Sequence, residues 1–338
     1  MQMCESFSQF FIDKVANIIS NINTSAFSPD IEFNEFTHCE QSLYELAPVT
    51  TEELRRVISS SPTKSCTLDT IPTWLLKKTL DSHLPVLTAI VNLSLSSGTM
   101  LSSAKTAVVI PLLKQPTLEP TIQRNYRPIS NLSFIGKMTE RVVLKRLVSH
   151  IQNNNLDEKF QSAYKAQHST ETALLRIHND LACLMDRNQA VFLVLLDLSA
   201  AFDTVSHVKL LNILRTSIGI TGTALDWFVS YLRDRSQRVC VNGALSNPQR
   251  IHHGVPQGSV LGPVLFSLYT RPMQDIIQHH GLSYHRYADD IQLYTSYDPA
   301  NPSSCESAVQ KLQNCIKHIG HWMSNNSLQL NNKKKLNF

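Results

Sequence analysis

The feature that most constrains this chain is a pair of adjacent aspartates, Asp289 and Asp290, within residues 283–295 (SYHRYADDIQLYT). Aromatic and β-branched residues flank the pair on both sides in rough alternation, which predicts two short strands around a tight turn. Such turns usually contain Asn-Gly or Asp-Gly, because glycine tolerates a positive φ angle. Two adjacent carboxylates repel each other, so the pattern favours either a solvated hairpin tip or a site where a cation offsets the charge.

A third carboxylate, Asp197, comes directly after the apolar run 190–196 (AVFLVLL). A continuous apolar run of this length is typical of a central strand that is buried on both faces. If this strand and the Asp289 hairpin are neighbours, three carboxylates converge on one edge of the sheet. Mg²⁺ prefers oxygen ligands, and pairs of Mg²⁺ ions held by carboxylates support in-line phosphoryl transfer. The alternative for Asp197 is an ordinary strand-end or turn residue.

The rest of the chain predicts helices with short strands between them. Apolar residues recur at helical spacing in nine segments, which are residues 5–22, 54–58, 72–98, 133–150, 169–184, 208–214, 225–232, 260–268 and 309–319. Residues 107–113 predict a strand, and residues 238–253 a hairpin. Thr50 begins a capping-box pattern with Glu53, and Ser169 is a good N-cap. This order predicts an α+β fold with a small, mostly antiparallel sheet.

Charge and cysteine usage limit the class of protein. The 31 Lys and Arg against 27 Asp and Glu give a net charge of +4, which permits nucleic-acid binding without requiring it. Lys137, Arg141 and Lys145 follow one another at four-residue steps, and this helix face either contacts phosphates or is solvated. The seven cysteines contain no Cys-x-x-Cys pair and suit a reducing compartment. No apolar run approaches eighteen residues, so we expect a soluble, intracellular protein without a membrane span.

Several segments together resemble one enzyme family. Residues 192–203 (FLVLLDLSAAFD), 254–263 (GVPQGSVLGP) and 287–290 (YADD) resemble motifs A, B and C of reverse transcriptases, in that family's order. Residues 125–130 (NYRPIS) resemble the fingers motif, and residues 160–170 (FQSAYKAQHST) resemble the segment that follows it. The amino-acid sequences of these motifs are similar to those of LINE-type (non-LTR) retrotransposon reverse transcriptases, and the resemblance covers roughly residues 48–335.

The resemblance implies a right-hand polymerase fold with fingers and palm. It predicts an N-terminal helix and linker at 1–47, a helical extension at 48–93 and the reverse transcriptase domain at 94–338. Asp197, Asp289 and Asp290 would be the catalytic ligands of two Mg²⁺ ions, with Mn²⁺ as a substitute. The expected partners are an RNA template, a DNA primer and dNTPs, and the expected location is the nucleus or the cytoplasm.

The resemblance also assigns residues around the nucleotide. Phe202 would be a bulky gate beneath the incoming sugar that excludes a 2′-hydroxyl, or an ordinary core aromatic. Gln257 and Gly258 would lie against the nucleotide, glycine allowing close approach, or form a plain strand-to-helix turn. Arg127 would clamp the triphosphate, or be a surface arginine before a proline. Lys334 aligns with the catalytic lysine that protonates the diphosphate, or belongs to a solvated lysine run.

The chain also departs from the family. Nothing in it resembles the endonuclease that usually precedes this region, and it stops just past Lys334, so we expect fingers and palm with the thumb missing. The predicted function is an RNA-directed DNA polymerase domain that extends a primer with dNTPs. The alternative is a truncated retrotransposon remnant that binds nucleic acid without polymerising. Another palm-type enzyme, such as an RNA-templated RNA polymerase or a nucleotide cyclase, is disfavoured by Phe202 and the 254–259 loop.

Overall fold

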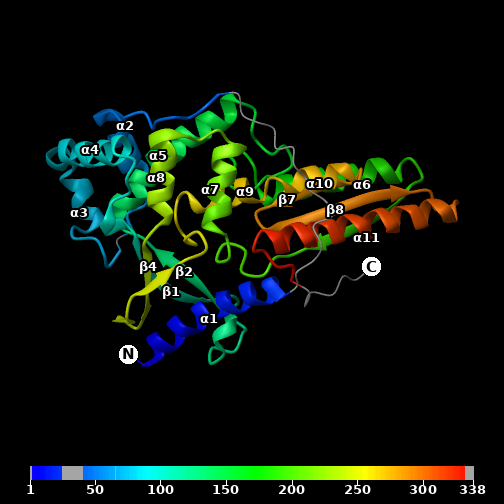
Figure 1. Ribbon diagram of the computed structural model, residues 1–338, viewed down its shortest axis with the longest axis horizontal. Helices are drawn as coiled ribbons and strands as arrows, with labels where there is room; N and C mark the ends of the chain where they lie inside the picture. The colour runs from blue at the N-terminus through cyan, green and yellow to red at the C-terminus, as the bar shows by residue number, and fades with distance from the viewer. Residues whose placement is uncertain (1, 25–40, 65, 332–338) are drawn as a thin grey trace. The chain divides into compact units, whose positions relative to one another are not determined.

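The computed structural model of the chain describes residues 2–24, 41–64 and 66–331. Contacts divide it into two compact units, whose helices and strands are drawn in Figure 1. The first unit comprises Met1–Asn17, Thr37–Asp157 and Ser206–Leu265, and the second comprises Ile18–Phe36, Glu158–Val205 and Phe266–Phe338. Each unit is therefore assembled from segments that are far apart in the sequence. The domain boundaries predicted at 47/48 and 93/94 stay predictions.

The first unit contains a five-stranded sheet in the order β2-β1-β4-β5, with β6 also paired to β4. β1 pairs with β2 in antiparallel and with β4 in parallel orientation. The strands are β1 (Thr106–Leu113), β2 (Tyr126–Asn131), β4 (Arg235–Val241), β5 (Ala244–Leu245) and β6 (Gln249–Ile251). Its helices are α2 (Thr51–Ser60), α3 (Thr73–Lys78), α4 (Leu80–Ser96), α5 (Phe134–Asn153), α7 (His207–Thr216) and α8 (Gly222–Leu232). Short 3₁₀ turns at Ser102–Ala104 and Gln123–Asn125 precede β1 and β2.

The N-terminal helix α1 (Gln2–Thr24) contributes to the core of this first unit. Phe7 and Phe11, one helical turn apart, are buried against Val109 of β1 and Val239 of β4. Tyr126 of β2 meets Phe7 edge to face, with the two ring centroids 5.0 Å apart. The helix predicted at residues 5–22 is confirmed, and its apolar face covers part of the sheet.

The second unit is built on a three-stranded antiparallel sheet in the order β3-β8-β7. Its strands are β3 (Ala190–Leu196), β7 (Ser283–Tyr287) and β8 (Asp290–Tyr297), and its helices are α6 (Thr170–Met185), α10 (Met273–His279) and α11 (Pro302–Asn325). Figure 1 shows α11 running alongside β8. The helix α9 (Gly262–Thr270) follows the 254–261 loop of the first unit and enters the second.

One expectation about the sheet was wrong. The apolar run 190–196 predicted a central strand buried on both faces, but β3 lies at the edge of its sheet. Val194 and Leu196 are buried, whereas Leu193 and Leu195 on the opposite face are 42% and 63% exposed. Successive side chains of β3 therefore alternate between core and surface. The sequence does not reveal this alternation, because the exposed positions carry apolar residues where a half-buried strand usually has polar ones. The α+β class is confirmed.

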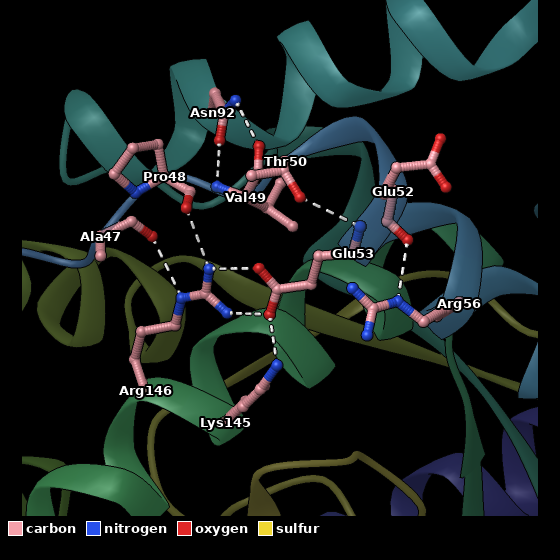
Figure 2. A network of polar contacts seen from close by, with 10 residues as sticks. All are labelled: Ala47, Pro48, Val49, Thr50, Glu52, Glu53, Arg56, Asn92, Lys145 and Arg146. Atoms are coloured by element: carbon pink, nitrogen blue, oxygen red, sulfur yellow. Dashed lines mark hydrogen bonds and ion pairs between the residues drawn. The ribbon is translucent and has the colours of Figure 1, made fainter.

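A polar network joins α2 to α5 within the first unit (Figure 2). Arg146 donates to both carboxylate oxygens of Glu53, at 2.6 and 2.8 Å, and also to the carbonyl oxygens of Ala47 and Pro48. Lys145 adds a third contact to Glu53 at 2.8 Å. Of the basic face predicted at Lys137, Arg141 and Lys145, the Lys145 ammonium is thus engaged by Glu53, and Arg141 Nη1 donates to Ser61 Oγ at 2.5 Å.

The described residues contain no helix that is both long enough and apolar enough to cross a membrane. Among them, Cys4, Cys66, Cys183, Cys240, Cys305 and Cys315 are free thiols.

Candidate functional site: an acidic sheet end and a glycine loop

The acidic residues lie at one end of the three-stranded sheet. The last β3–β8 pair is Leu196 with Ile291. Asp197 directly follows Leu196 and Asp290 directly precedes Ile291, so the two aspartates occupy adjoining strand ends. Asp289 belongs to the two-residue turn between β7 and β8. The expectation that the two acidic segments are carried by neighbouring strands is confirmed, while their role as metal ligands stays a prediction.

The fit of a metal ion depends on donor type and on placement. Carboxylate oxygens are the ligands that Mg²⁺ prefers, and two of the segments that carry them are neighbours. No group of three or more His, Cys, Asp or Glu side chains within the described residues is arranged to hold a metal ion. The donors therefore fit by chemistry and by strand position, without forming a three-residue coordination group in this structure.

Asp197 is held by a residue near the end of the described chain. The backbone N–H of Asn331 donates to the Asp197 carbonyl oxygen at 2.9 Å, and its side-chain Nδ2 donates to Asp197 Oδ2 at 2.8 Å. An antiparallel bridge between Leu198 and Leu330 continues the pairing. Asn331 therefore orients the carboxylate of Asp197. It was missed because its contact spans more than a hundred residues and no local pattern marks it. Lys334 lies outside the described residues.

Tyr164 is a second residue that the sequence did not single out for chemistry. Burial, and then the nearby Asp289 carboxylate, raise the pKa of the Tyr164 hydroxyl. Its backbone is in the left-handed region, with φ of 64°, and its side chain is about half exposed. Tyr164 follows the FQSA segment at 160–163, so the family resemblance of that segment was the available signal. The tyrosine places a polar group beside the turn formed by Ala288 and Asp289, here called the acidic turn.

Phe202 packs firmly after β3. Its ring is 8% exposed and stacks on Phe266 of α9, with centroids 4.6 Å apart and planes at 22°. Both residues belong to the second unit. The stacking fixes the orientation of the Phe202 ring. A steric gate requires a fixed ring, but an ordinary core aromatic has one as well. The gate role stays a prediction that kinetics can decide.

The loop at residues 254–261 of the first unit, here called the glycine loop, packs closely on β2. The Ser130 N–H donates to the Gln257 carbonyl oxygen at 2.7 Å. Gly258 has φ of 117°, and a Cβ atom added there would lie 2.5 Å from the Ser130 carbonyl oxygen. Any side chain at 258 would therefore collide with backbone as well as strain the turn. The side-chain oxygen Oε1 of Gln257 is buried and has no hydrogen-bond partner among the residues that the structure describes, which suits a group that binds a ligand.

Glu140 of α5 holds the other end of this loop. Its Oε2 accepts the backbone N–H groups of Val260 at 2.8 Å and Leu261 at 3.0 Å, just before α9 begins. The side chain is 1% exposed. Burial raises the pKa of Glu140, and the nearby Arg235 opposes that effect. A sequence signal existed, because helical spacing places Glu140 on the apolar face of α5 with Val143 and Leu147, where a carboxylate needs partners.

A cluster of cations lies around the β1–β2 hairpin. Arg127 of β2 is exposed and pairs across the strands with Leu112. Burial, and then the neighbouring cations Lys14 and Arg127, lower the pKa of Lys114. The Lys114 ammonium also donates to the Arg124 carbonyl oxygen at 2.8 Å. Mutually repelling cations at one place favour the binding of an anion. Lys114 and Lys14 were missed because they come together only in the folded chain.

Comparisons with known proteins agree with these motifs. Residues 112–338 match the family model described as "Reverse transcriptase (RNA-dependent DNA polymerase)", so the chain belongs to the reverse transcriptase family. It is 29% identical over 323 residues to the RNA-directed DNA polymerase from mobile element jockey of Drosophila funebris, covering 92% of this chain and 34% of that protein. The jockey protein of Drosophila melanogaster is 30% identical over 299 residues, covering 86% and 32%.

The probable RNA-directed DNA polymerase from transposon BS of Drosophila melanogaster is 28% identical over 298 residues, covering 86% of this chain and 32% of that protein. The chain therefore spans about a third of the length of these curated relatives. Among solved structures, apo telomerase from Candida tropicalis, truncated from the C-terminal domain, aligns with a TM-score of 0.48 and 13% identity over 70% of this chain and 50% of that one. The resemblance to reverse transcriptases of non-LTR mobile elements is confirmed. The family in general depends on divalent metal ions.

Proposed function

We propose that this chain is an RNA-directed DNA polymerase domain that extends a primer 3′-hydroxyl with dNTPs on an RNA template. The observation that carries the proposal is the β3–β8 register, which makes Asp197 and the Asp289–Asp290 turn neighbours at one sheet end. Membership of the reverse transcriptase family supports it independently. Because the chain spans about a third of its relatives, the activity of this segment needs a direct test.

The acidic residues would hold the ions. Asp197, Asp289 and Asp290 supply oxygen ligands for two Mg²⁺ ions, and Mn²⁺ suits the same donors. Ions held there would supply the charge that activates the attacking hydroxyl and that offsets the charge developing at the transferring phosphate. Asn331 keeps the Asp197 carboxylate oriented through its side-chain amide. Such support of a ligand by a hydrogen-bonded neighbour commonly changes metal affinity or activity about 10–100-fold.

The other residues would bind and select the nucleotide. Arg127 and Lys114 offer cationic groups for the triphosphate, Arg127 in a bidentate manner. Gln257 would contact the nucleotide through its side-chain amide, whose oxygen has no hydrogen-bond partner within the described part of the chain. Gly258 keeps the loop close to β2. Phe202 would exclude a ribose 2′-hydroxyl. We keep Lys334 as the proposed proton donor to the diphosphate.

Primer extension tests the proposal. The purified chain is supplied with a primed RNA template, dNTPs and Mg²⁺, beside Asp289→Asn and Asp197→Asn. The matched control is Asp186→Asn, which changes an exposed aspartate after α6 in the same unit. We expect extension by wild type and control, and a loss of about a hundredfold to a thousandfold in the two site variants, as is typical for loss of a group that stabilises transition-state charge.

Two outcomes would count against the proposal. Equal extension by wild type and Asp289→Asn would remove the acidic turn from the chemistry. Absence of extension by every protein, with RNA binding retained in a gel-shift assay, would favour the alternative of a remnant that binds nucleic acid without polymerising.

A further inference from the structure

The backbone of the acidic turn is bracketed by a single buried side chain, Gln161. The Ala288 N–H donates to Gln161 Oε1 at 3.1 Å, and Gln161 Nε2 donates back to the Ala288 carbonyl oxygen at 3.2 Å. Gln161 Oε1 also accepts the Ala163 N–H at 3.0 Å. Gln161 is 2% exposed. One primary amide therefore fixes the peptide groups on both sides of Ala288, the residue before Asp289.

Ala288 needs this support because of its backbone conformation. It has φ of 57°, a left-handed value that glycine adopts easily and that a residue with a Cβ atom adopts at a cost. The turn contains only Ala288 and Asp289, since Tyr287 pairs with Asp290 across the hairpin. A change in the Ala288 dihedrals would therefore redirect the Asp289 side chain. Strain of this kind persists where the surroundings enforce it.

Gln161 is itself held in place by the strand that leads into the turn. The Arg286 N–H donates to the Phe160 carbonyl oxygen at 2.8 Å, and the Ser162 N–H donates to the Arg286 carbonyl oxygen at 3.0 Å. These two bonds form a parallel bridge between Gln161 and Arg286. The fully buried Arg286 guanidinium also contacts Glu158 at 2.7 Å. The segment around Gln161 is thus tied to β7 at one isolated bridge and by one buried ion pair.

We infer that Gln161 is a positioning residue, whose amide locks the Ala288 peptide groups so that Asp289 is held ready to bind a divalent cation. The inference rests on the proposed function, because it assigns Asp289 to the metal. Glutamine suits this task since its side-chain amide carries a donor and an acceptor on the same carbon atom, Cδ, matching the acceptor and donor of one backbone residue. Gln161 acts through Ala288 and does not itself touch a reacting group.

The test replaces Gln161 by Met, which keeps the length of the side chain and removes both hydrogen-bonding groups. The control is Gln310→Met, at an exposed position on α11 of the same unit. Two quantities are measured on the full chain without template or nucleotide. They are the affinity for Mn²⁺, from the electron paramagnetic resonance signal of the free ion, and hydrogen exchange of the peptide that contains Ala288.

For Gln161→Met we expect Mn²⁺ affinity to fall at least about tenfold, as for loss of other groups that orient metal ligands. The Ala288 amide should exchange at least about tenfold faster, because its acceptor is gone. Amides in the middle of α11 should keep wild-type protection, and Gln310→Met should match wild type in both measurements. The apparent Mg²⁺ requirement for primer extension should rise in parallel for Gln161→Met.

Three results would overturn the inference. A folded Gln161→Met protein could keep the wild-type Mn²⁺ affinity and the wild-type exchange rate of Ala288. That result would show that the turn does not depend on the two hydrogen bonds between Gln161 and Ala288. Loss of protection throughout α11 as well as the turn would show a general structural role. An equal effect of Gln310→Met would show that the substitution type is responsible. The failure of the proposed function is distinguishable, since it shows in the extension assay with Asp289→Asn, whereas neither measurement here requires polymerisation.

Discussion

The Glu53 carboxylate offers a quantitative test of how the first unit is held together. It accepts two hydrogen bonds from the Arg146 guanidinium and one from the Lys145 ammonium (Figure 2). The Glu53 and Arg146 side chains are only 16% and 12% exposed, whereas Lys145 is 63% exposed. Replacement of Glu53 by Gln removes the charge, keeps the size, and leaves Arg146 without its anionic partner.

The magnitude follows from the pKa of the carboxyl group. The hydrogen bond from Arg146 is the largest cause that lowers the pKa of Glu53 from 4.5 to about 2. At about 1.4 kcal/mol per pKa unit this difference sets an upper bound of about 3 kcal/mol. Partial contact with solvent screens the pair, so we expect Glu53→Gln to lower the free energy of unfolding by about 1–2 kcal/mol at pH 7.

The pH dependence has a definite sign. Because the pKa of Glu53 is lower in the folded than in the unfolded chain, the stabilisation is fully present above pH 4.5 and is lost as the pH falls toward about 2. The difference between wild type and Glu53→Gln should therefore be constant from pH 7 to pH 5 and shrink steadily below pH 4.5. Urea unfolding at several pH values, followed by the fluorescence of the chain's tryptophans, one of which is the buried Trp227 of the same unit, measures it.

The matched control for this experiment is Glu52→Gln. Glu52 lies in the same first turn of α2, so both substitutions remove the same interaction with the helix dipole. Its carboxylate is 72% exposed and contacts Arg55 at 3.8 Å, a pair of little expected value. Equal effects of the two substitutions, or a Glu53→Gln effect that does not change between pH 5 and pH 3, would refute the reasoning.

Three further predictions concern the candidate site. Phe202→Val should raise the ratio of ribonucleotide to deoxyribonucleotide incorporation at least about tenfold by opening space beneath the sugar, and should cost about 1–3 kcal/mol in urea unfolding through lost stacking on Phe266. Gly258→Ala should lower kcat/KM for dNTPs at least about tenfold, because its Cβ atom would lie 2.5 Å from the Ser130 carbonyl oxygen; steady-state extension measures this. Glu140→Leu should cost about 2–5 kcal/mol in urea unfolding, because two backbone N–H groups of the glycine loop lose their shared acceptor.

The parts of the fold that the sequence predicted well are those set by neighbours in the chain. Ser133 and Ser169 accept hydrogen bonds from the third residues of α5 and α6, and Ser169 completes a capping box with Thr172. Thr50 likewise accepts the Glu53 N–H at 3.1 Å. The second hydrogen bond of the predicted capping box would run from the Thr50 N–H to the Glu53 side chain. That side chain is instead held by Arg146. A long-range ion pair outcompeted a local cap.

The parts that could not be predicted depend on contacts between distant segments. The parallel pairing of β1 with β4 joins residues more than a hundred positions apart. Glu140 and Gln161 each act on a backbone more than a hundred residues away. Hydrogen bonds from a side chain to a remote backbone leave no periodic pattern, since the acceptor or donor on the partner is present in every residue. The family motifs pointed toward Gln161 and toward the loop that Glu140 contacts, and the helical spacing of α5 pointed toward Glu140 itself, but neither signal identified the hydrogen-bonding partner.

The acidic turn combines two locally unfavourable features, a positive φ angle at an alanine and two adjacent carboxylates. A glycine at position 288 would adopt φ of 57° without strain, but it would also let the turn sample other conformations. Alanine narrows the choice, and Gln161 then selects the left-handed one by pairing with both of its peptide groups. The rigidity matters because Asp289 and Asp290 repel each other and would move apart in a flexible loop. The strain at Ala288 and the charge at Asp289 are thus parts of one arrangement, in which a buried amide stabilises a backbone that no local interaction favours.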